Sequence, residues 1–477
     1  MLGSIPLSSR RRALLGGLLA GLAAGCAHMP GAVRSTRGGR VLIIGAGFAG
    51  LSAARALRQS GMQVVVLEAR SRPGGRVLTD RSLGFPIDLG PSWLHGGPLN
   101  PLKTLAEGSG IATQVSNYAN FRFTNASSGR RVQVAPADLL DAAQKFNDAM
   151  SSASLWRSLN ASNAATRGLS VADVFEAAVR RIEERDGPID RGVVALQRWL
   201  LESNLAAPLE EVGAAALLDD SGTGAGNEVL PPDDRLVTAG MDRLISLLAL
   251  DLDLRYNQVV QSITWRPGAV TVGTAGTQWQ ADSVVVTLPI GVLAEGNVRF
   301  DPPLPASIAE PMSRLRMGLL NKICLTFPYS FWDQRADFLT FYSNPPPLYY
   351  AWLNLMRYGS TPALLGFTSG RMARTVETMT DEALVDRLMR RMRAARGVRV
   401  PEPLAVRVSH WAGDPYARGS YSYPGLGASG NDRSQLARPV EDTLFFAGEA
   451  THRDDPASVH GAWWSGLRAA RQILGEA

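Results

Sequence analysis

Three glycines and one acid have a spacing that suits nucleotide binding. Gly45, Gly47 and Gly50 follow a short apolar run, and Glu68 comes about twenty residues later, at the interval of dinucleotide-binding motifs. Such glycines let the backbone turn tightly and approach a pyrophosphate at a helix N-terminus, whose N–H groups favour anions. A carboxylate at the fourth position accepts hydrogen bonds from a ribose 2′-hydroxyl and repels a 2′-phosphate. The pattern predicts NAD or FAD, whereas a plain glycine-rich loop would leave Glu68 unexplained.

The elements that must position these residues are a strand, a helix and a second strand. Residues 41–44 and 64–67 are apolar runs of the kind found in buried parallel strands, and the stretch from Phe48 to about Ser60 is predicted to be helical. A helix in this position directs its N-terminus at the pyrophosphate. The start of the chain after residue 40 is therefore predicted to be a βαβ unit.

Arginines follow Glu68, and their pattern favours FAD over NAD as the cofactor. Arg70, Arg72 and Arg76 flank Gly74-Gly75, and the run from Glu68 to Arg76 resembles the E-x-R-x-R-x-G-G-R signature of the flavin amine oxidase superfamily. The resemblance implies FAD, with Arg70 and Arg76 along its diphosphate and ribityl chain. Three solvated arginines are the alternative.

The segment from Ser409 to Pro424 carries the resemblance further. It is similar to the segment shared by lysine-specific histone demethylases, polyamine oxidases and monoamine oxidases. The resemblance implies that Trp411 and Tyr421 line the site beside the isoalloxazine ring. Monoamine oxidases carry a flavin-linked cysteine where Ser420 stands, so FAD is predicted to bind non-covalently here.

A lysine and a histidine complete the predicted catalytic residues. The only lysines of the chain are Lys103, Lys145 and Lys322, and a compact ammonium can be desolvated and hold a water in a way that a guanidinium cannot. By resemblance Lys322 holds a water against flavin N5, and a surface lysine at a strand edge is the alternative. His95 stands where several polyamine oxidases carry a histidine near the substrate, although a lone histidine is often structural.

The remaining FAD contacts also follow from the resemblance. The Val260 backbone would meet adenine, Glu449 would bond ribityl or diphosphate hydroxyls, and the N–H of Val459 would point at the flavin O2 carbonyl, where a helix dipole stabilises an anionic reduced flavin. The predicted FAD-binding residues are Gly45, Gly47, Ala49, Gly50, Glu68, Arg70, Gly75, Arg76, Ser92, Trp93, Val260, Gly448, Glu449, Ser458 and Val459. No metal site is predicted.

The fold class predicted by resemblance is α/β, with a Rossmann-like FAD-binding domain and an interleaved α+β substrate-binding domain. The FAD-binding domain is expected to comprise residues 38–95, 235–300 and 430–477, and the substrate-binding domain residues 96–234 and 301–429. Glu202, Asp219 and Asp220 are candidate acids for a cationic substrate tail, with solvated helix ends as the alternative.

The charge of the chain excludes a nucleic-acid surface. The formal net charge is +6, and residues 1–40 contain six arginines and no acid, which leaves a net charge of zero from residue 41 onward. With 45% hydrophobic residues the chain has ample material for a core. Two cysteines, Cys26 and Cys324, are too few for a disulfide framework.

The N-terminal segment resembles an export signal. Ser9-Arg-Arg-Arg12 opens an apolar segment that reaches about Gly25 and is too short to span a bilayer comfortably. Residues 1–26 are therefore predicted to be a twin-arginine signal peptide and residues 27–38 a linker, which implies a periplasmic or otherwise exported protein. Leu22 to Cys26 also resembles a lipobox, so Cys26 is a possible lipid anchor, with an ordinary cleavage site as the alternative.

The activity that the resemblance implies is FAD-dependent amine oxidation. Hydride would pass from the α-carbon of a neutral polyamine or other primary or secondary amine to flavin N5, giving an imine that hydrolyses to an aldehyde, and oxygen would be reduced to hydrogen peroxide. The alternatives are an amine dehydrogenase that uses a periplasmic electron carrier, and a non-catalytic flavin-binding or amine-binding protein. The particular amine and the oligomeric state are left open.

Overall fold

The expected strand, helix and strand occur at the start of the described chain. The computed structural model describes residues 38–96, 100–125, 132–159, 168–214, 233–342, 349, 351–396 and 400–476. The predicted signal peptide, Cys26 and nearly all of the predicted linker therefore lie outside the described residues. Strand β1 (Arg40–Ile44), helix α1 (Phe48–Gln59) and strand β2 (Gln63–Leu67) follow one another, and the two strands pair in parallel.

These strands form the centre of a five-stranded parallel sheet. Its order is β10-β2-β1-β14-β23, with β10 at Leu254–Arg255, β14 at Ser283–Val286 and β23 at Leu444–Phe446. The strands come from three separated parts of the chain, each inside one of the segments expected for FAD binding. From Thr36 onward the chain forms one compact unit, so the expected domain boundaries stay a prediction.

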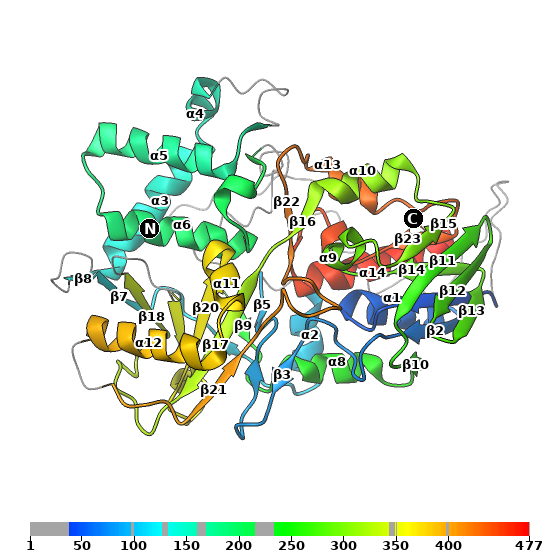
Figure 1. Cartoon of the computed structure of the whole chain (residues 1–477), viewed down its shortest axis with the longest axis horizontal. Helices are drawn as coiled ribbons and strands as arrows, with labels where there is room; N and C mark the ends of the chain where they lie inside the picture. Colours follow the sequence, from blue (N-terminus) through cyan, green and yellow to red (C-terminus); the bar gives the residue numbers. More distant parts are fainter. Residues whose placement is uncertain are drawn as a thin grey trace. The chain divides into compact units, whose positions relative to one another are not determined.

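Each face of the parallel sheet has its own apolar layer. Val41 and Ile43 face α1 and α14 (Val459–Leu474), whereas Leu42 and Ile44 face a second, four-stranded sheet. This alternation explains why every residue of the run is buried although it shows no polar and apolar periodicity. Figure 1 shows the blue N-terminal helix α1 beside the red C-terminal helix α14.

The four-stranded sheet has the order β13-β12-β11-β15. Its strands are β11 (Val260–Arg266), β12 (Ala269–Thr274), β13 (Thr277–Ala281) and β15 (Arg299–Asp301). Five helices stand near the two sheets: α2 (Pro101–Gly108), α8 (Asp242–Ala249), α9 (Ile290–Ala294), α10 (Ala306–Arg314) and α13 (Asn431–Leu436).

A third, seven-stranded sheet carries the segments between the nucleotide-binding parts. Its order is β21 (Ala405–Val408), β17 (Leu320–Thr326), β20 (Ala363–Ser369), β19 (Ala351–Asn354), β18 (Phe338–Tyr342), β7 (Phe121–Asn125) and β8 (Val132–Val134). Residues of α12 (Asp381–Arg396) pack on one face with Ile323 and Leu364. The opposite face carries Cys324 and Leu365, together with Lys322 by the alternation of side chains along β17.

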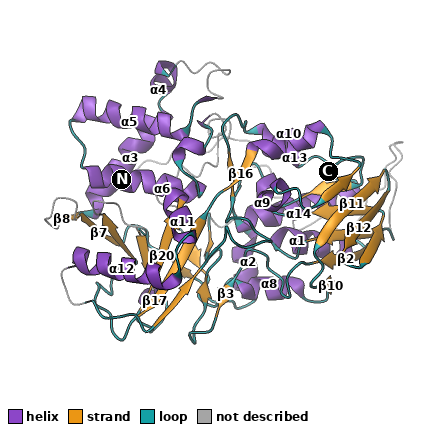
Figure 2. Cartoon of the chain, viewed as in Figure 1, coloured by secondary structure: helices purple, strands orange, loops and turns teal. Residues whose placement is uncertain are grey.

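Helices α3 (Pro136–Ser151), α4 (Ala153–Ser158), α5 (Val171–Asp186) and α6 (Arg191–Leu205) form a helical region, shown in purple at the upper left of Figure 2. Helix α11 (Gly370–Glu377) follows β20 directly. Short strands connect the larger parts: β3 (Thr79–Asp80), β4 (Ile87–Asp88), β5 (Trp93–Leu94), β6 (Gln114–Val115), β9 (Arg235–Leu236), β16 (Leu315–Met317) and β22 (Ser422–Pro424).

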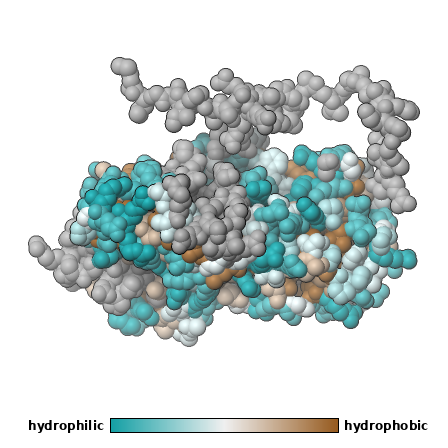
Figure 3. Space-filling view, turned by 90° about the horizontal axis from the view of Figure 1, so that it is seen from above, coloured by the Kyte–Doolittle hydropathy of each residue, from teal (hydrophilic) through white to brown (hydrophobic). Residues whose placement is uncertain are grey.

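One side of the molecule can be followed in the space-filling view of Figure 3. On the side shown in Figure 3, hydrophobic residues outside the grey atoms lie in small groups among hydrophilic ones. In the described ranges, no helix combines the length and hydropathy that a bilayer crossing requires.

Candidate active site

The glycines of the first motif divide into packing glycines and open glycines. A Cβ at Gly50 would lie 1.9 Å from the Gly45 oxygen, and a Cβ at Gly45 would lie 2.4 Å from Thr287 Oγ1, so both positions need the absence of a side chain for close packing. A Cβ at Gly47 would meet nothing nearer than the Gly74 oxygen at 3.9 Å, and a Cβ at Gly75 nothing nearer than Gly47 Cα at 3.9 Å. Space therefore remains beside Gly47 and Gly75.

Helix α1 directs its first N–H groups towards this space. The first hydrogen bond of the helix runs from Leu51 N to the Gly47 oxygen (2.9 Å), so the N–H groups of Phe48, Ala49 and Gly50 precede it. No acidic residue stands in the first turn of α1. A helix N-terminus beside an open glycine has the charge and the room for a diphosphate.

Glu68 is held at the carboxyl end of β2. Its side chain is 4% exposed, and its two oxygens accept hydrogen bonds from Ala46 N (2.8 Å) and Arg70 N (2.9 Å). Gln258 N donates to the Glu68 backbone oxygen at 2.9 Å, which joins the segment just before β11, whose first residue is Val260, to the end of β2. The predicted ribose and adenine contacts thus come from neighbouring parts of the structure.

The three arginines after Glu68 have different partners. Arg70 Nη2 pairs with Asp414 Oδ1 at 2.7 Å, and its guanidinium stands 5.3 Å from the Tyr416 ring centroid. Arg72 donates to the backbone oxygens of Pro73, Gly75 and Val77, so it folds the glycine loop on itself. The sequence did not distinguish these two roles.

Arg76 contacts two residues from the C-terminal part of the chain. Its Nη1 donates to Glu449 Oε1 (2.9 Å) and to the Ser420 backbone oxygen (2.9 Å). Ser422 Oγ donates to Glu449 Oε2 at 2.6 Å. Burial alone would raise the pKa of Glu449, but the charges of Arg76 and Arg433 and the Ser422 hydrogen bond lower this pKa overall. Glu449 is therefore a buried anion, and a cofactor hydroxyl would join protein donors that already contact it.

Lys322 is buried at 4% exposure among oxygen acceptors. Its Nζ donates to the Asp88 backbone oxygen (3.0 Å), to Ser92 Oγ (2.6 Å) and to the Gly90 backbone oxygen. The same Nζ lies 5.7 Å from the ring centroid of Trp93. An ammonium has three donors, so a water held by Lys322 would replace one of these protein acceptors.

Burial sets the protonation of this lysine. It lowers the pKa of Lys322 to about 8, and the negative charge of Asp88 opposes the change. Burial in turn raises the pKa of Asp88 to about 6, against hydrogen bonds from Thr79 Oγ1 (2.5 Å) and Met241 N (3.1 Å). Burial thus acts against the charged form of both groups, and the charge of each group favours the charged form of the other.

Trp411 is fixed by a buried polar network. The indole Nε1 donates to the Leu89 oxygen at 3.1 Å, and the backbone N donates to Asn321 Oδ1 at 3.1 Å. Asn321 is fully buried, and its Nδ2 donates to Glu377 Oε1 at 2.7 Å. Ser409 Oγ donates to the same Asn321 oxygen at 3.2 Å and accepts from the Lys322 backbone N at 2.8 Å. One amide therefore joins the Trp411 and Lys322 segments.

Tyr421 and Ser420 lie next to the Arg76 contact. The Tyr421 hydroxyl donates to the Ser203 backbone oxygen in α6, and burial, together with the charge of Glu449, raises the Tyr421 pKa. The Ser420 hydroxyl accepts from Leu320 N at 2.8 Å. A serine at this position offers no thiol for a link to flavin.

His95 has a buried carboxylate as its partner. Its Nδ1 lies 2.6 Å from Asp234 Oδ2, and its ring stacks on Trp93 with the centroids 6.5 Å apart. Asp234 is fully buried and also accepts from the Tyr118 hydroxyl at 3.1 Å. The His95 side chain is 49% exposed, so it is oriented by Asp234 while part of its ring reaches solvent.

The C-terminal residues of the predicted set surround the start of α14. Ser458 is the N-cap of this helix, and its Oγ accepts from Gly461 N at 2.9 Å. Val459 is the first helical residue. A Cβ at Gly448 would meet nothing within 4 Å, and Gly448 N donates to Ser465 Oγ at 2.8 Å. Gly448 thus adds another open position.

Of the three candidate acids for a substrate tail, Glu202 is the one that lies in the described part of the chain. Glu202 Oε1 pairs with Arg198 Nε at 3.2 Å, and burial raises the Glu202 pKa. Asp219 and Asp220 lie outside the described residues. Sequence reasoning missed Asp88, Asp234, Asn321, Glu377 and Asp414 as partners of predicted site residues, and Asp414, inside the recognised Trp411 segment, was the one with a local signal.

The chain resembles known proteins over most of its length. The profile of the family described as "Flavin containing amine oxidoreductase" matches residues 48–474. Another profile, "Alanine dehydrogenase/PNT, C-terminal domain", matches residues 17–78 alone, a small part of the chain. The chain is 34% identical to Protein FLOWERING LOCUS D of Arabidopsis thaliana, over 91% of this chain and 55% of that protein. It is 33% identical to Polyamine oxidase 2 of Arabidopsis thaliana, over 91% of this chain and 88% of that protein.

Solved structures show the same fold. A wild-type putrescine oxidase bound to putrescine has a TM-score of 0.73 and 22% identity, and covers 92% of this chain and 99% of its own. Cyclohexylamine oxidase from Brevibacterium oxydans IH-35A has a TM-score of 0.74, with the same identity and coverage. The expected α/β fold class is confirmed. The chain spans about half the length of the first curated relatives, at 52–58%.

The fold and the site define a flavoprotein oxidoreductase. The chain belongs to the flavin-containing amine oxidoreductase family, and its cofactor is FAD, as the sequence predicted. The open positions at Gly47, Gly75 and Gly448 and the N-terminus of α1, whose first turn has no acidic residue, fit a diphosphate, and buried Glu68 fits a ribose. Non-covalent binding stays a prediction, which rests on the serine at position 420.

Proposed function

We propose that this chain oxidises an amine and passes the electrons to dioxygen. The observation that carries the proposal is the buried Lys322 ammonium, which stands between Ser92, Trp93 and Phe367 and shares a polar network with Trp411. FAD supplies the acceptor for the hydride that leaves the amine α-carbon. Dioxygen would take up the two electrons together with two protons as hydrogen peroxide, and the imine formed from the amine would be hydrolysed to an aldehyde.

The roles of the chain's own residues follow from their surroundings. Trp411 and Tyr421 are largely buried, and their polar atoms are bonded to Leu89 and Ser203. Apolar ring faces therefore exclude water and a charged ammonium from the site, and they orient a neutral amine with its C–H bond towards the cofactor. His95, held by Asp234, has part of its ring in solvent, where it meets an incoming amine.

The substrate class that we propose is a polyamine or another primary or secondary amine. The support is indirect: the relatives include a polyamine oxidase, a putrescine oxidase and a cyclohexylamine oxidase. Glu202 is already paired with Arg198, so a distant carboxylate for a long polyamine has no support from that residue. A short or singly charged amine is therefore the first to test.

Replacing Lys322 by Met tests the oxidase assignment. If turnover is fast with oxygen, dioxygen is the electron acceptor. Reoxidation of the reduced flavin should then be at least about tenfold slower in the Lys322→Met variant, because a positive charge near the reacting oxygen is lost. The exposed Lys145 on α3, which pairs with Asp141, gives the matched control Lys145→Met. Turnover with an artificial acceptor and not with oxygen would instead identify an amine dehydrogenase.

We further propose that the protein is exported by the twin-arginine route. This proposal is supported by sequence alone, since residues 1–26 lie outside the described residues, and it includes a lipid anchor at Cys26. Replacing Arg10 and Arg11 by Lys should abolish export, and Cys26→Ala should release the exported protein from membranes. Export of the Lys-substituted protein would contradict the signal assignment.

A further inference from the structure

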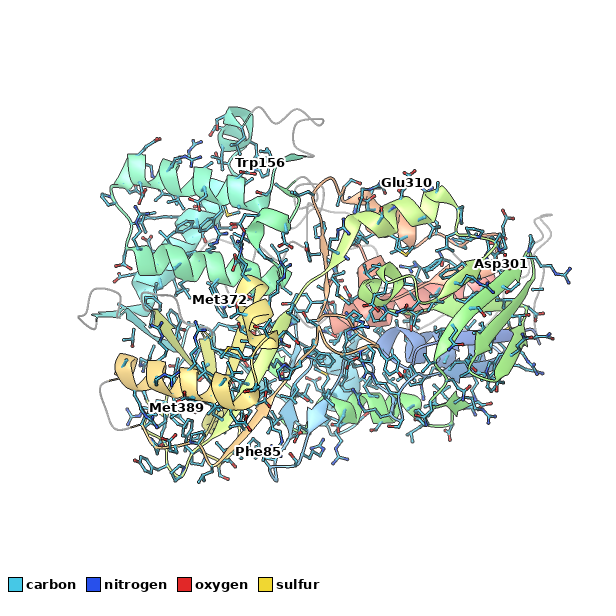
Figure 4. The ribbon with its side chains drawn as sticks, in the orientation of Figure 1. Phe85, Trp156, Asp301, Glu310, Met372 and Met389 are labelled. Carbon is cyan, nitrogen blue, oxygen red and sulfur yellow. The ribbon has the colours of Figure 1, made fainter. Side chains whose placement is uncertain are left out.

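A pocket lies beside the residues that contact Lys322 Nζ. It has a volume of about 290 Å³ and is formed by the segment Gly84–Asp88, by β9 with Val237 and Thr238, and by residues 353–365 of the seven-stranded sheet region. Phe85, labelled at the lower edge of Figure 4, belongs to this segment and packs with the cluster of Leu353 and Leu365. Exposed Gly84 and Ser360 mark the mouth of the pocket.

The inner end of the pocket reaches the lysine. Asp88 and Ser92 line the pocket and are buried at 8% and 2% exposure. Both contact Lys322 Nζ, through the Asp88 backbone oxygen at 3.0 Å and Ser92 Oγ at 2.6 Å. Two residues that line the pocket are therefore in direct contact with the ammonium.

The pocket is distinct from the side on which the cofactor and amine are predicted to lie. Of the predicted site residues, Ser92 alone lines it, and Gly47, Arg76, Trp411 and Tyr421 do not. A molecule in the pocket would thus approach Lys322 without passing the aromatic residues of the amine side.

The walls favour a small apolar occupant. The inner walls are Ile87, Leu236, Leu353 and Leu365, each at most 7% exposed. The carboxylate of Asp88 already accepts from Thr79 and Met241, and the Tyr358 hydroxyl donates to Ser116 Oγ at 3.0 Å. An ammonium would lose its hydration there without a free counterion, whereas apolar cavities accept small apolar molecules such as xenon.

We propose that this pocket is the route by which dioxygen reaches Lys322 and the cofactor. The inference rests on the proposed oxidase function. At the end of the route dioxygen gains two electrons from reduced FAD and two protons, and it leaves as hydrogen peroxide while the cofactor returns to its oxidised form. A separate route lets oxygen react while product still occupies the amine side.

Two variants close the pocket at different depths. Thr361→Trp places a large ring near the mouth, and Leu365→Phe fills the inner end from β20. Thr375→Trp on the exposed face of α11 is the matched control for the first, because Thr375 does not line the pocket. Xenon binding in crystals of the FAD-loaded protein gives a measurement that does not depend on turnover.

The kinetic test starts from protein whose FAD has been reduced by light and an electron donor, so that it needs no amine substrate. Mixing with oxygenated buffer should show reoxidation slowed about fivefold or more in both pocket variants and unchanged in Thr375→Trp. Xenon should occupy the wild-type pocket and be lost in Leu365→Phe. Where an amine that reduces the wild type is known, its anaerobic reduction rate should stay within about twofold in the pocket variants.

Unchanged reoxidation in both pocket variants, or no xenon in the wild-type pocket, would overturn the proposal. Equal slowing of anaerobic reduction and of reoxidation would also overturn it, because the variants would then have disturbed the site as a whole. Failure of every amine to reduce the flavin would reject the proposed function alone, since the photoreduced protein still reports on the route.

Discussion

Arg76 Nη1 donates a hydrogen bond to Glu449 Oε1 at 2.9 Å, although 373 residues separate the two in sequence. Arg76 ends the first nucleotide-binding motif and Glu449 follows β23, the last strand of the parallel sheet. Both side chains are largely buried. The contact therefore closes the predicted FAD site by joining its first and last segments.

Glu449→Gln should weaken FAD binding by about thirtyfold, because Arg76 and Arg433 keep their charges while their shared anion is removed. Equilibrium dialysis of FAD, followed by flavin fluorescence, measures the change. The exposed Glu441 provides the control Glu441→Gln, which should bind FAD as the wild type does. Equal FAD affinity in the Glu449 variant would show that this ion pair does not shape the cofactor site.

Gly47→Ala and Gly50→Ala should have opposite consequences. The backbone of Gly47 has φ −80° and ψ −176°, which alanine adopts freely, and its Cβ would enter open space. This variant should fold normally without cofactor and lose about tenfold or more in FAD affinity. Gly50→Ala should instead destabilise the fold by about 3 kcal/mol, since its Cβ would overlap the Gly45 oxygen.

Denaturant unfolding of the cofactor-free proteins and FAD titration separate the two effects. Gly47→Ala protein that retains full FAD affinity would contradict a diphosphate at this position. An unaltered stability of Gly50→Ala would contradict the close approach of α1 to β1.

Asn321→Ala should disturb Trp411 and Lys322 together. The buried amide accepts from Trp411 N and Ser409 Oγ and donates to Glu377, so its loss leaves several buried groups without partners and should lower the free energy of unfolding by about 2 to 4 kcal/mol. The near-ultraviolet circular dichroism of the tryptophans should change as well. The exposed Asn297 gives the control Asn297→Ala, for which both properties should be unchanged.

The lowered pKa of Lys322 predicts a pH-dependent stability. The ordinary pKa is 10.5 and the folded value about 8, so between these two pH values the unfolded chain binds more protons than the folded one. Stability of the wild type should therefore rise with pH across this window relative to Lys322→Met, by at most about 3 kcal/mol. The pKa of Asp88 in the wild type, about 6, lies below the window.

Urea unfolding of the two proteins near pH 7 and near pH 10 measures this difference. A constant difference between them would mean that Lys322 keeps its ordinary pKa in the fold, and the buried environment assigned to it would be wrong.

The sequence predicted the parts of the fold that local spacing encodes. The interval between the glycines and Glu68 defines the βαβ unit because a strand, a tight turn and a helix leave little freedom in length. The resemblance added the segments 235–300 and 430–477, in which the structure places the remaining strands of the parallel sheet. Lys322 was singled out because lysine is rare in this chain and because its position resembles that of the family lysine near flavin N5.

The partners of the site residues were beyond sequence reasoning. Arg70 and Arg72 stand two residues apart and look equivalent, yet one pairs with Asp414 and the other with backbone oxygens of its own loop. Asp233 and Asp234 are adjacent acids that look equivalent in the sequence, yet Asp234 is the one that is fully buried and contacts His95. Such choices depend on packing between segments far apart in the chain, which no spacing rule specifies.

The most direct test of amine oxidation is anaerobic mixing of the FAD-loaded protein with a panel of amines. The reaction is followed by the absorbance of the oxidised flavin at about 450 nm. The panel should include a polyamine, a diamine, an aliphatic or cyclic monoamine, an N-methylated amine and an amino acid. We predict that at least one class bleaches the flavin rapidly and that admission of oxygen restores the colour with formation of hydrogen peroxide. If no amine bleaches a fully loaded flavin, amine oxidation is not the function of this chain and only its fold and cofactor remain.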